Sequence, residues 1–135
     1  MADGRKMLIG EAARQADLNP KTIRFYEEVG LVAPAGRTPK GYRLFDAEAV
    51  SRLGFIKKAQ ALGFTLAEIR EILELRDGGA MPCEHVEAEV VRKVEAIEER
   101  IAELEGLKAS LKALLEGWKE PEAAEAAVCP QIEGA

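Results

Sequence analysis

The feature that most constrains this chain is an apolar stripe in its second half, with a period of about 3.5 residues. From about Glu84 to Trp118 no proline occurs. One position of the stripe, repeated every seven residues, holds Val90, Ile97, Leu104, Leu111 and Trp118, and the other holds Val94, Ile101 and Leu115, with Lys108 as its polar member. This seam predicts one helix of roughly 50 Å, at ~1.5 Å per residue, that packs lengthwise against another helix.

A helix of this length cannot bury its far end against a small domain. We therefore expect a second copy of the chain, parallel or antiparallel, to cover the seam in a homodimer. A helix that folds back onto its own domain is the alternative. Lys108 fits either a residue that sets register and orientation or one whose ammonium group reaches out to solvent.

The start of the chain predicts a helix-turn-helix. Residues 8–16 carry apolar side chains at helical spacing. Asn19 is a suitable cap for a second helix, Pro20 fits the first position of that helix, and Gly30 ends it. Ile23 and Val29 are expected to face inward. Two short helices joined by a turn of three or four residues are typical of this motif.

A wing and two further helices are expected to follow. In residues 31–45 the Lys-Gly step before the YRLF string predicts a hairpin. Asp46 is placed to cap a third helix, and Thr65 with Glu68 forms the T-x-x-E capping box of a fourth. The expected fold is mainly α, with a winged helix-turn-helix domain over residues 1–76, a linker and long dimerisation helix over residues 77–118, and a C-terminal effector loop, with one turn of helix, over residues 119–135.

The net charge of −5 conceals two parts of opposite sign. Residues 1–76 hold 13 basic and 10 acidic side chains, a net charge of +3, whereas residues 77–135 hold 6 and 14, a net charge of −8. Opposite signs indicate two parts with different partners. The chain has no run of ~20 apolar residues that would cross a membrane and no apolar core of a signal peptide, so a cytoplasmic protein is expected, with no membrane partner.

Basic and aromatic side chains gather on the second predicted helix and on the wing. A helix-turn-helix reads DNA through its second helix, whose first-turn N–H groups also favour phosphate. The candidate DNA contacts are Lys21, Thr22, Arg24 and Tyr26 on the helix, and Arg37, Lys40, Tyr42 and Arg43 on the wing. Because residues 1–58 carry 11 basic and 7 acidic side chains, a net charge of only +4, ordinary solvated charges are the alternative.

Three segments resemble the N-terminal domain of the MerR family of transcription regulators. They read IGEAARQADLNPKTIRFYEEVGLVAPAGRT, GYRLFD and AVSRLGFIKKAQALGFTLAEIREIL. The TIRFYE string, the GL step after it and the GYRLF strand are the specific pieces, and with the long helix the resemblance covers nearly the whole chain. On this resemblance, Thr22, Arg24 and Tyr26 lie on the recognition helix, and Tyr42 and Arg43 lie on a wing that grips the DNA backbone.

The resemblance also implies a mechanism. It implies an antiparallel coiled-coil dimer on a palindromic, double-stranded promoter operator whose spacer is too long. Effector binding then untwists and kinks the DNA, so that RNA polymerase can read both promoter elements. Deformation of this kind is indirect readout, in which the energy of bending supplies much of the specificity.

Cys83, His85 and Cys129 are the candidate metal ligands. The chain has two cysteines and one histidine, and in a cytosolic protein such cysteines favour metal or redox chemistry over a disulfide. Cys83 opens the long helix, where a thiolate is favoured, and Cys129 follows beyond the far end of that helix. In an antiparallel dimer, Cys129 of one chain approaches Cys83 and His85 of the other, which gives two identical sites.

The metal-sensing branch of the family supports these candidates and also shows a departure. In that branch a cysteine opens the dimerisation helix, and a loop ends in a pattern like C-P-x-I-E, here residues 129–133. Members that bind mercury, zinc, cadmium or lead usually carry a further loop cysteine, which this chain lacks. Copper(I) sensors usually have two loop cysteines and none at the start of the helix, so this chain fits them poorly.

The donor set leaves several soft or borderline ions open. Two thiolates suit linear Hg(II), whereas an added imidazole and water or carboxylate suit Zn(II) or Cd(II). The acidic candidates for an extra ligand are Glu84, Glu87 and Glu133. The expected function is a metal-responsive activator of a resistance or homeostasis operon. The alternatives are a thiol-based redox or aldehyde stress sensor on the same scaffold, and inert surface residues.

Other classes of protein fit less well. The sequence offers no nucleophile–base pair, phosphate loop or paired catalytic carboxylates, so neither an enzyme nor an organic cofactor is expected. A purely structural coiled-coil adaptor would not need the basic and aromatic set on the predicted recognition helix and wing.

Overall fold

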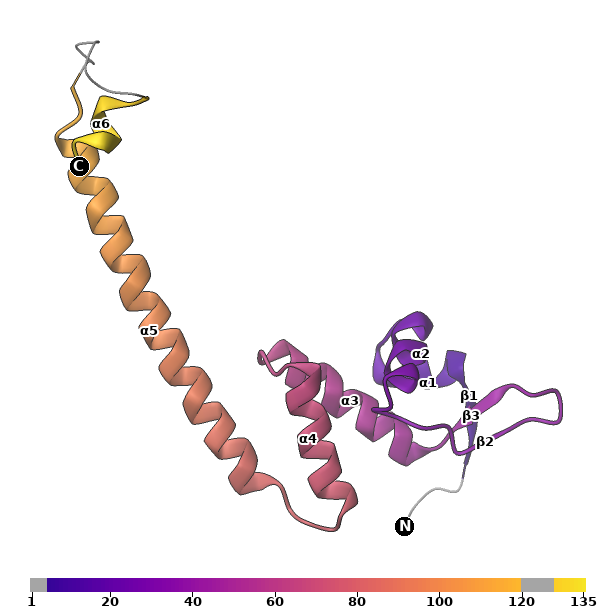
Figure 1. The fold of residues 1–135 in the computed structure, drawn as a ribbon. Coiled ribbons are helices and arrows are strands. Elements are labelled where there is room, and N and C mark those ends of the chain that lie inside the picture. The colour runs from indigo at the N-terminus through magenta and orange to yellow at the C-terminus, as the bar shows by residue number, and fades with distance from the viewer. Residues whose placement is uncertain (1–4, 120–127) are drawn as a thin grey trace. The chain divides into compact units, whose positions relative to one another are not determined.

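A computed structural model describes residues 5–119 and 128–135 (Figure 1). The chain divides into two compact units, Met1–Pro82 and Cys83–Ala135, and each is described by itself. Among the described residues, no helix combines the length and the apolar character needed to cross a membrane.

The first unit begins with the predicted helix-turn-helix, formed by α1 (Ile9–Ala16) and α2 (Pro20–Glu28). Asp17 ends α1 in the left-handed conformation, with φ of 53°. The side chain of Asn19 then caps α2 by accepting a hydrogen bond of 2.9 Å from the backbone N–H of Lys21. Pro20 occupies the first turn, as predicted. The first N–H groups of a helix have no intrahelical acceptor, so the N–H that proline lacks costs no hydrogen bond there.

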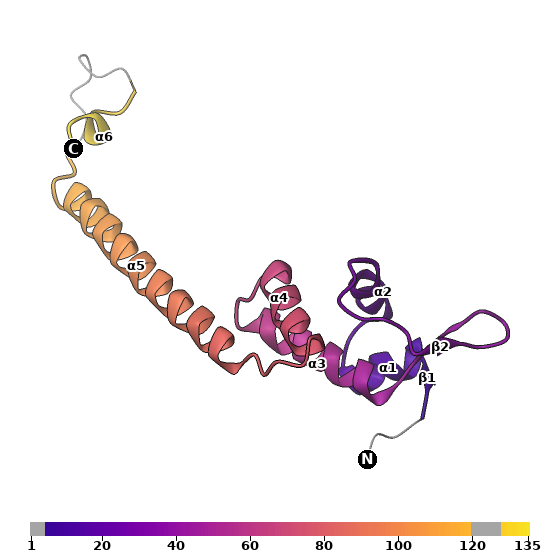
Figure 2. The same ribbon diagram turned by 60° about the horizontal axis from the view of Figure 1, so that its bottom comes forward.

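Three short strands form an antiparallel sheet beside these helices, in the order β1 (Met7–Leu8), β3 (Arg43–Phe45), β2 (Gly36–Arg37). The hairpin of β2 and β3 is the predicted wing, and Figures 1 and 2 show its loop projecting away from the helices. Strand β1 was not predicted: Met7 pairs with Phe45 and Leu8 with Leu44. The sheet therefore joins the start of the described chain to the wing.

Two longer helices complete the first unit, α3 (Ala47–Ala61) and α4 (Leu66–Asp77). The Asp46 side chain caps α3 by accepting from the N–H of Ala49 at 2.9 Å. At the start of α4, Thr65 and Glu68 form the predicted capping box, in which each side chain accepts from the other's backbone N–H. These caps satisfy amides that a helix end leaves without partners.

The core of the first unit lies among α1, α2, α3, α4 and the sheet. Six large side chains are fully buried there: Ile23, Leu31, Phe45, Leu53, Ile56 and Ile69. Three alanines of α1, Ala12, Ala13 and Ala16, are also buried, and α1 contacts α3 and α2 closely. Small side chains on α1 allow this approach, which fixes the position of α2 on the domain.

The described part of the second unit contains the predicted long helix, α5 (Cys83–Glu116), and a turn of helix, α6 (Pro130–Glu133). At ~1.5 Å per residue α5 is about 50 Å long. The eight apolar seam residues are between 42% and 69% exposed within the single chain. Trp118 lies just beyond the end of α5 rather than within it, after the turn at Gly117. Residues 120–127 of the predicted effector loop lie outside the described residues.

Candidate nucleic-acid interface and thiol sites

The outer face of α2 carries the predicted DNA-reading side chains. Lys21 and Arg24 are exposed, and Thr22 is half-buried at the first turn. The backbone N–H groups of Lys21, Thr22 and Ile23 already donate to Asn19, so the exposed side chain of Lys21 supplies the free positive charge at this end of the helix dipole. The arrangement suits an anionic partner that meets the start of α2 and then runs along Arg24.

The structure differs from the sequence analysis at Tyr26. This residue is only 4% exposed, and its hydroxyl hydrogen-bonds the side-chain carbonyl of Gln60 on α3. Burial also raises the pKa of the phenol above its ordinary value. Tyr26 lies three residues after Ile23, so both side chains face the core. The placement corrects the expected DNA contact: Tyr26 holds α2 against α3 instead of facing outward.

The wing presents polar side chains from a closely bonded turn. Thr38 donates its N–H to Tyr42 O at 2.8 Å and accepts from the N–H of Tyr42 at 3.1 Å. Arg37 Nη1 donates to Gly41 O at 2.8 Å, and Gly41 adopts φ of +89°, which favours glycine. The turn therefore leaves Lys40 exposed and Tyr42 63% exposed at the predicted positions.

Arg43 is partly engaged within the domain. Its Nε lies 2.6 Å from Glu27 Oε2 on α2, in a pair whose carboxylate is largely buried. The pair joins the wing strand β3 to the last turn of the recognition helix. Arg43 therefore aligns the wing with α2, and one of its nitrogens is already engaged.

A hollow with a volume of about 780 Å³ lies between the wing, α2 and the start of α1. Its basic and aromatic lining consists of Arg5, Lys6, Arg14, Arg24, Tyr42 and Arg43. Among the described residues, no side chain caps α1 at Leu8, and the first residues of α1 also line the hollow. Uncapped N–H groups at a helix start favour anions, whereas the carboxylate of Glu11, which also lines the hollow, pairs with Arg14 and offsets part of its charge.

Arg5, Lys6 and Arg14 were not among the candidates from the sequence. The adjacent basic pair at residues 5 and 6 was a signal that could have indicated part of this surface. What brings it to the hollow is the pairing of β1 with β3, a contact between segments far apart in the sequence. The hollow extends the predicted DNA surface along the N-terminal strand.

The two cysteines are free and accessible at opposite ends of the second unit. Cys83 is the exposed first residue of α5, and Cys129 is half-exposed just before α6. The side chain of Gln131 on α6 donates to Lys119 O, and α6 lies against the C-terminal end of α5 around Ala113 and Gly117. Figure 1 shows α6 beside the C-terminal end of α5.

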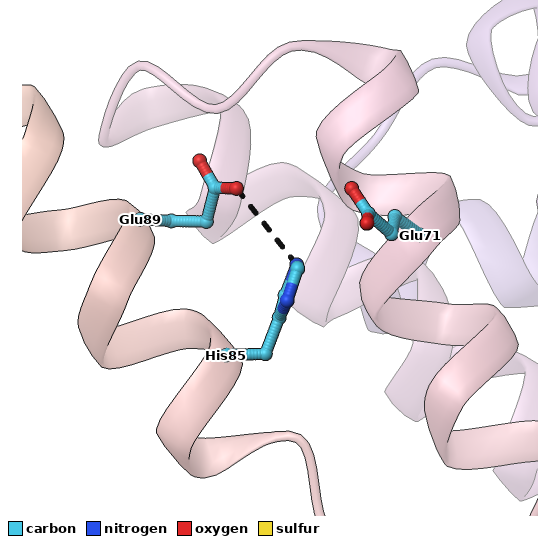
Figure 3. A group of neighbouring side chains, drawn as sticks. All are labelled: Glu71, His85 and Glu89. Atoms are coloured by element: carbon cyan, nitrogen blue, oxygen red, sulfur yellow. Dashed lines mark ion pairs between the residues drawn. The ribbon is translucent and has the colours of Figure 1, made fainter.

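His85 faces a different direction from Cys83. Two positions along an α-helix correspond to a rotation of roughly 200°, so the side chains of residues 83 and 85 leave α5 on nearly opposite faces. His85 Nε2 lies 3.8 Å from Glu89 Oε1, one turn further along the same helix (Figure 3). The structure therefore does not bring the predicted ligands Cys83 and His85 together on one face.

Comparison with known proteins gives consistent family matches. Residues 7–75 match the model of the MerR HTH family regulatory protein, and residues 50–114 match a model described as MerR, DNA binding. The mercuric resistance operon regulatory protein of Bacillus cereus is 39% identical over 128 residues, which are 95% of this chain and 96% of that protein.

Two solved structures extend the likeness to the long helix and tail. The regulator PbrR691 from Ralstonia metallidurans CH34, in complex with lead(II), has a TM-score of 0.74 and 33% identity, covering 95% of this chain and 98% of that one. MerR from Bacillus megaterium MB1, in complex with mercury(II), has a TM-score of 0.63 and 38% identity with the same coverage. The winged helix-turn-helix, the long helix and these matches show that the chain belongs to the MerR family of transcription regulators.

Proposed function

We propose that this chain is a metal-responsive transcription regulator that binds promoter DNA as a homodimer and senses a soft metal ion through Cys83 and Cys129. The observation that carries the proposal is the placement of two free thiols at opposite ends of α5, in a chain similar over 95% of its length to a mercuric resistance regulator. The predicted boundaries at residues 76 and 118 then separate a DNA-binding part, a dimerisation part and an effector loop.

The DNA-binding part presents α2 and the wing on the same side as the basic hollow. Lys21 and Arg24 supply exposed charge on α2, and Lys40 and Tyr42 supply the tip of the wing. Arg37, Thr22 and Arg43 have smaller roles, since Arg37 and Arg43 already bond within the wing or to α2. Contacts of this kind position the domain on phosphates more than they read bases.

The exposed seam of α5 supports the homodimer. Large apolar side chains that remain 42% to 69% exposed along a helix of 34 residues are a stripe that needs a partner. A second copy supplies an identical stripe, and an antiparallel pairing satisfies a two-fold axis across the helix. RNA polymerase and a palindromic promoter are the further partners that the likeness to MerR-family regulators implies.

The thiols can share an ion only across such a dimer. Within one chain, α6 lies at the C-terminal end of α5, so Cys129 is separated from Cys83 by about the 50 Å length of that helix. In an antiparallel dimer the C-terminal end of one α5 meets the start of the other. Two equal sites then form, each with a thiol from either chain.

The donor chemistry fits a soft or borderline divalent ion. Both thiols are accessible and neither is in a disulfide, so thiolate ligation of Hg(II), Cd(II) or Zn(II) is chemically suitable. His85 would have to leave its pairing with Glu89 to join such a site. Glu84 and Glu87 are exposed on the first turns of α5, and Glu133 accepts from the N–H of Val128 at 3.3 Å. The ion acts as the effector, and the dimer converts its binding into untwisting of the promoter and activation of the operon.

The test uses chains that lack one thiol each. Cys83→Ser and Cys129→Ser homodimers should both lose Hg(II)-dependent run-off transcription and tight Hg(II) binding. A mixed dimer of one Cys83→Ser chain and one Cys129→Ser chain keeps one complete site if the thiols meet across the dimer, and should recover about one Hg(II) per dimer. Recovery of none would contradict the cross-dimer site.

A control separates metal sensing from thiol oxidation. Wild-type protein reduced and loaded with Hg(II) without oxidant should activate transcription. Activation by oxidant with no bound metal, measured by elemental analysis of the active protein, would favour the redox sensor instead. DNA binding itself should persist in all the Cys→Ser variants, because neither thiol belongs to the DNA-binding unit.

A further inference from the structure

Arg52 of α3 connects two distant parts of the DNA-binding unit through one guanidinium group. Its Nε donates to Leu31 O at 2.6 Å, three residues after the recognition helix ends. Its Nη1 and Nη2 donate to the two carboxylate oxygens of Asp77, at 2.7 and 2.9 Å. Asp77 is the last residue of α4, and α5 begins six residues later at Cys83. One side chain thus links the end of α2 to the end of α4.

The chemistry of the group makes the link stiff. A guanidinium is planar, and its fork matches a carboxylate through two parallel hydrogen bonds. With all three nitrogens engaged, Leu31 O and the Asp77 carboxylate are held at fixed positions relative to each other. The pair also holds the pKa of Asp77 below its usual value, mainly through the hydrogen bonds from Arg52.

The two ends of the link differ in how firmly they are packed. Leu31 is 1% exposed and belongs to the core next to α2. The Asp77 side chain is 55% exposed, and the residues of the link border a hollow with a volume of about 400 Å³. A displacement of the Asp77 end therefore meets little resistance from packing, whereas the Leu31 end moves only together with the segment that follows the recognition helix.

A second arginine acts on the same segment. Arg70 of α4 donates to Val29 O, directly after α2, and its Nη1 would lie 3.3 Å from a Cβ placed on Gly30. Gly30 also has φ of +79°. Two carbonyls at the end of the recognition helix, those of Val29 and Leu31, are thus held by arginines that belong to α4 or bond to it.

We propose that Arg52 is a positioning residue that transmits movement of the α4–α5 junction to the recognition helix when the effector binds. This role rests on the proposed function, since it assumes that a signal enters through α5. A displacement of Asp77 moves the Arg52 guanidinium group that is hydrogen-bonded to it. The hydrogen bond from Arg52 Nε to Leu31 O then shifts the segment that follows α2. Arg52 and Asp77 touch neither the proposed metal site nor the proposed DNA surface, so they affect the coupling between those two sites.

The variants Asp77→Asn and Arg52→Lys test the link in different ways. Asp77→Asn keeps the size of the side chain and removes its charge, and it also removes an acidic group from the C-terminal end of α4, where the helix dipole disfavours it. Arg52→Lys keeps the charge but cannot hold Leu31 O and both Asp77 oxygens together. A simple ion pair would survive the lysine substitution, whereas the stiff link would not.

Asp17→Asn is the matched control. Lys57, also on α3, donates to Asp17 O and Asp17 Oδ2 at 2.6 and 2.9 Å. This substitution therefore breaks a comparable ion pair from α3 to a helix end, but at the end of α1 instead of α4. Asparagine tolerates the left-handed conformation that Asp17 adopts.

The measurements are Hg(II) stoichiometry, promoter affinity without metal, thermal midpoint and the ratio of run-off transcription with and without Hg(II). In Asp77→Asn and Arg52→Lys the Hg(II) stoichiometry, the promoter affinity and the thermal midpoint should match those of the Asp17→Asn control. The transcription ratio should fall about tenfold below that of the control, as expected for lost coupling between two sites. Equal ratios in wild type and both variants would overturn the role of Arg52, as would a fall matched by equal losses of stability and promoter affinity. A wild-type protein that ignores Hg(II) would instead refute the proposed function.

Discussion

Ile101 lies near the middle of the seam, and its truncation gives a quantitative test of the dimer. In the single chain Ile101 is 50% exposed, so a partner helix can bury roughly half of its surface. Full burial of such a side chain is worth about 1.5–3 kcal/mol, which gives about 1 kcal/mol for half. A two-fold dimer contains the residue twice, so Ile101→Ala should weaken the dimer by about 2 kcal/mol, or roughly 30-fold in Kd.

The helix itself should tolerate this change. Alanine has a higher helix propensity than isoleucine, so the far-ultraviolet circular dichroism of the variant should keep its helical signal. Sedimentation equilibrium over a dilution series measures the monomer–dimer Kd directly. Glu99→Ala, two positions away on the same helix and outside the seam, is the control and should leave Kd near that of the wild type.

Two outcomes would refute the reasoning. If Ile101→Ala and Glu99→Ala have the same Kd, the seam is not the dimer interface. If the wild type remains monomeric at concentrations where it binds promoter DNA, the exposed stripe has another partner or folds back onto its own chain.

Three further predictions concern the DNA-binding unit. Tyr26→Phe removes the hydroxyl that bonds Gln60 and should cost about 1 kcal/mol in urea unfolding, with an unchanged salt dependence of DNA binding; a changed salt slope at full stability would restore Tyr26 as a DNA contact. Arg24→Ala should weaken promoter binding across sequences and reduce the slope of log K against log salt by about 1 if Arg24 meets a phosphate; an unchanged slope would argue against that contact. Because Arg52 lowers the pKa of Asp77, the stabilisation from this ion pair is fully present above the ordinary Asp pKa of about 3.9 and is lost as pH falls through the lower folded value. The thermal midpoint below pH ~4 should therefore fall more steeply with decreasing pH in wild type than in Asp77→Asn. Parallel curves of thermal midpoint against pH would contradict a stabilising ion pair.

The local elements of the fold were predictable because their signals lie within a few residues. The caps at Asn19 and Asp46 and the capping box of Thr65 with Glu68 each join a side chain to a backbone N–H within three positions. Such contacts depend on local geometry alone. The seam likewise repeats with a period that only a long helix satisfies.

The parts that escaped prediction depend on contacts between distant segments. Strand β1 has two residues, too few for a periodic signal, and exists because it pairs with β3. The burial of Tyr26 could have been foreseen from its spacing to Ile23, whereas its partner Gln60 lies 34 positions away in the chain. Most candidate contacts on α2 and the wing tip are accessible, but how far they contact DNA stays a prediction, as does the shared thiol site.

The pairing of β1 with the wing has a practical consequence for work with this protein. Because β1 begins at Met7 and Arg5 and Lys6 line the basic hollow, a sequence fused to the start of the chain is attached within a few residues of the surface proposed to meet phosphate. A polyhistidine or acidic tag placed there would add its own charge to that surface and would alter the apparent affinity for DNA. Binding constants measured with such a fusion would describe the tag together with the protein, and its removal before measurement is part of the experiment.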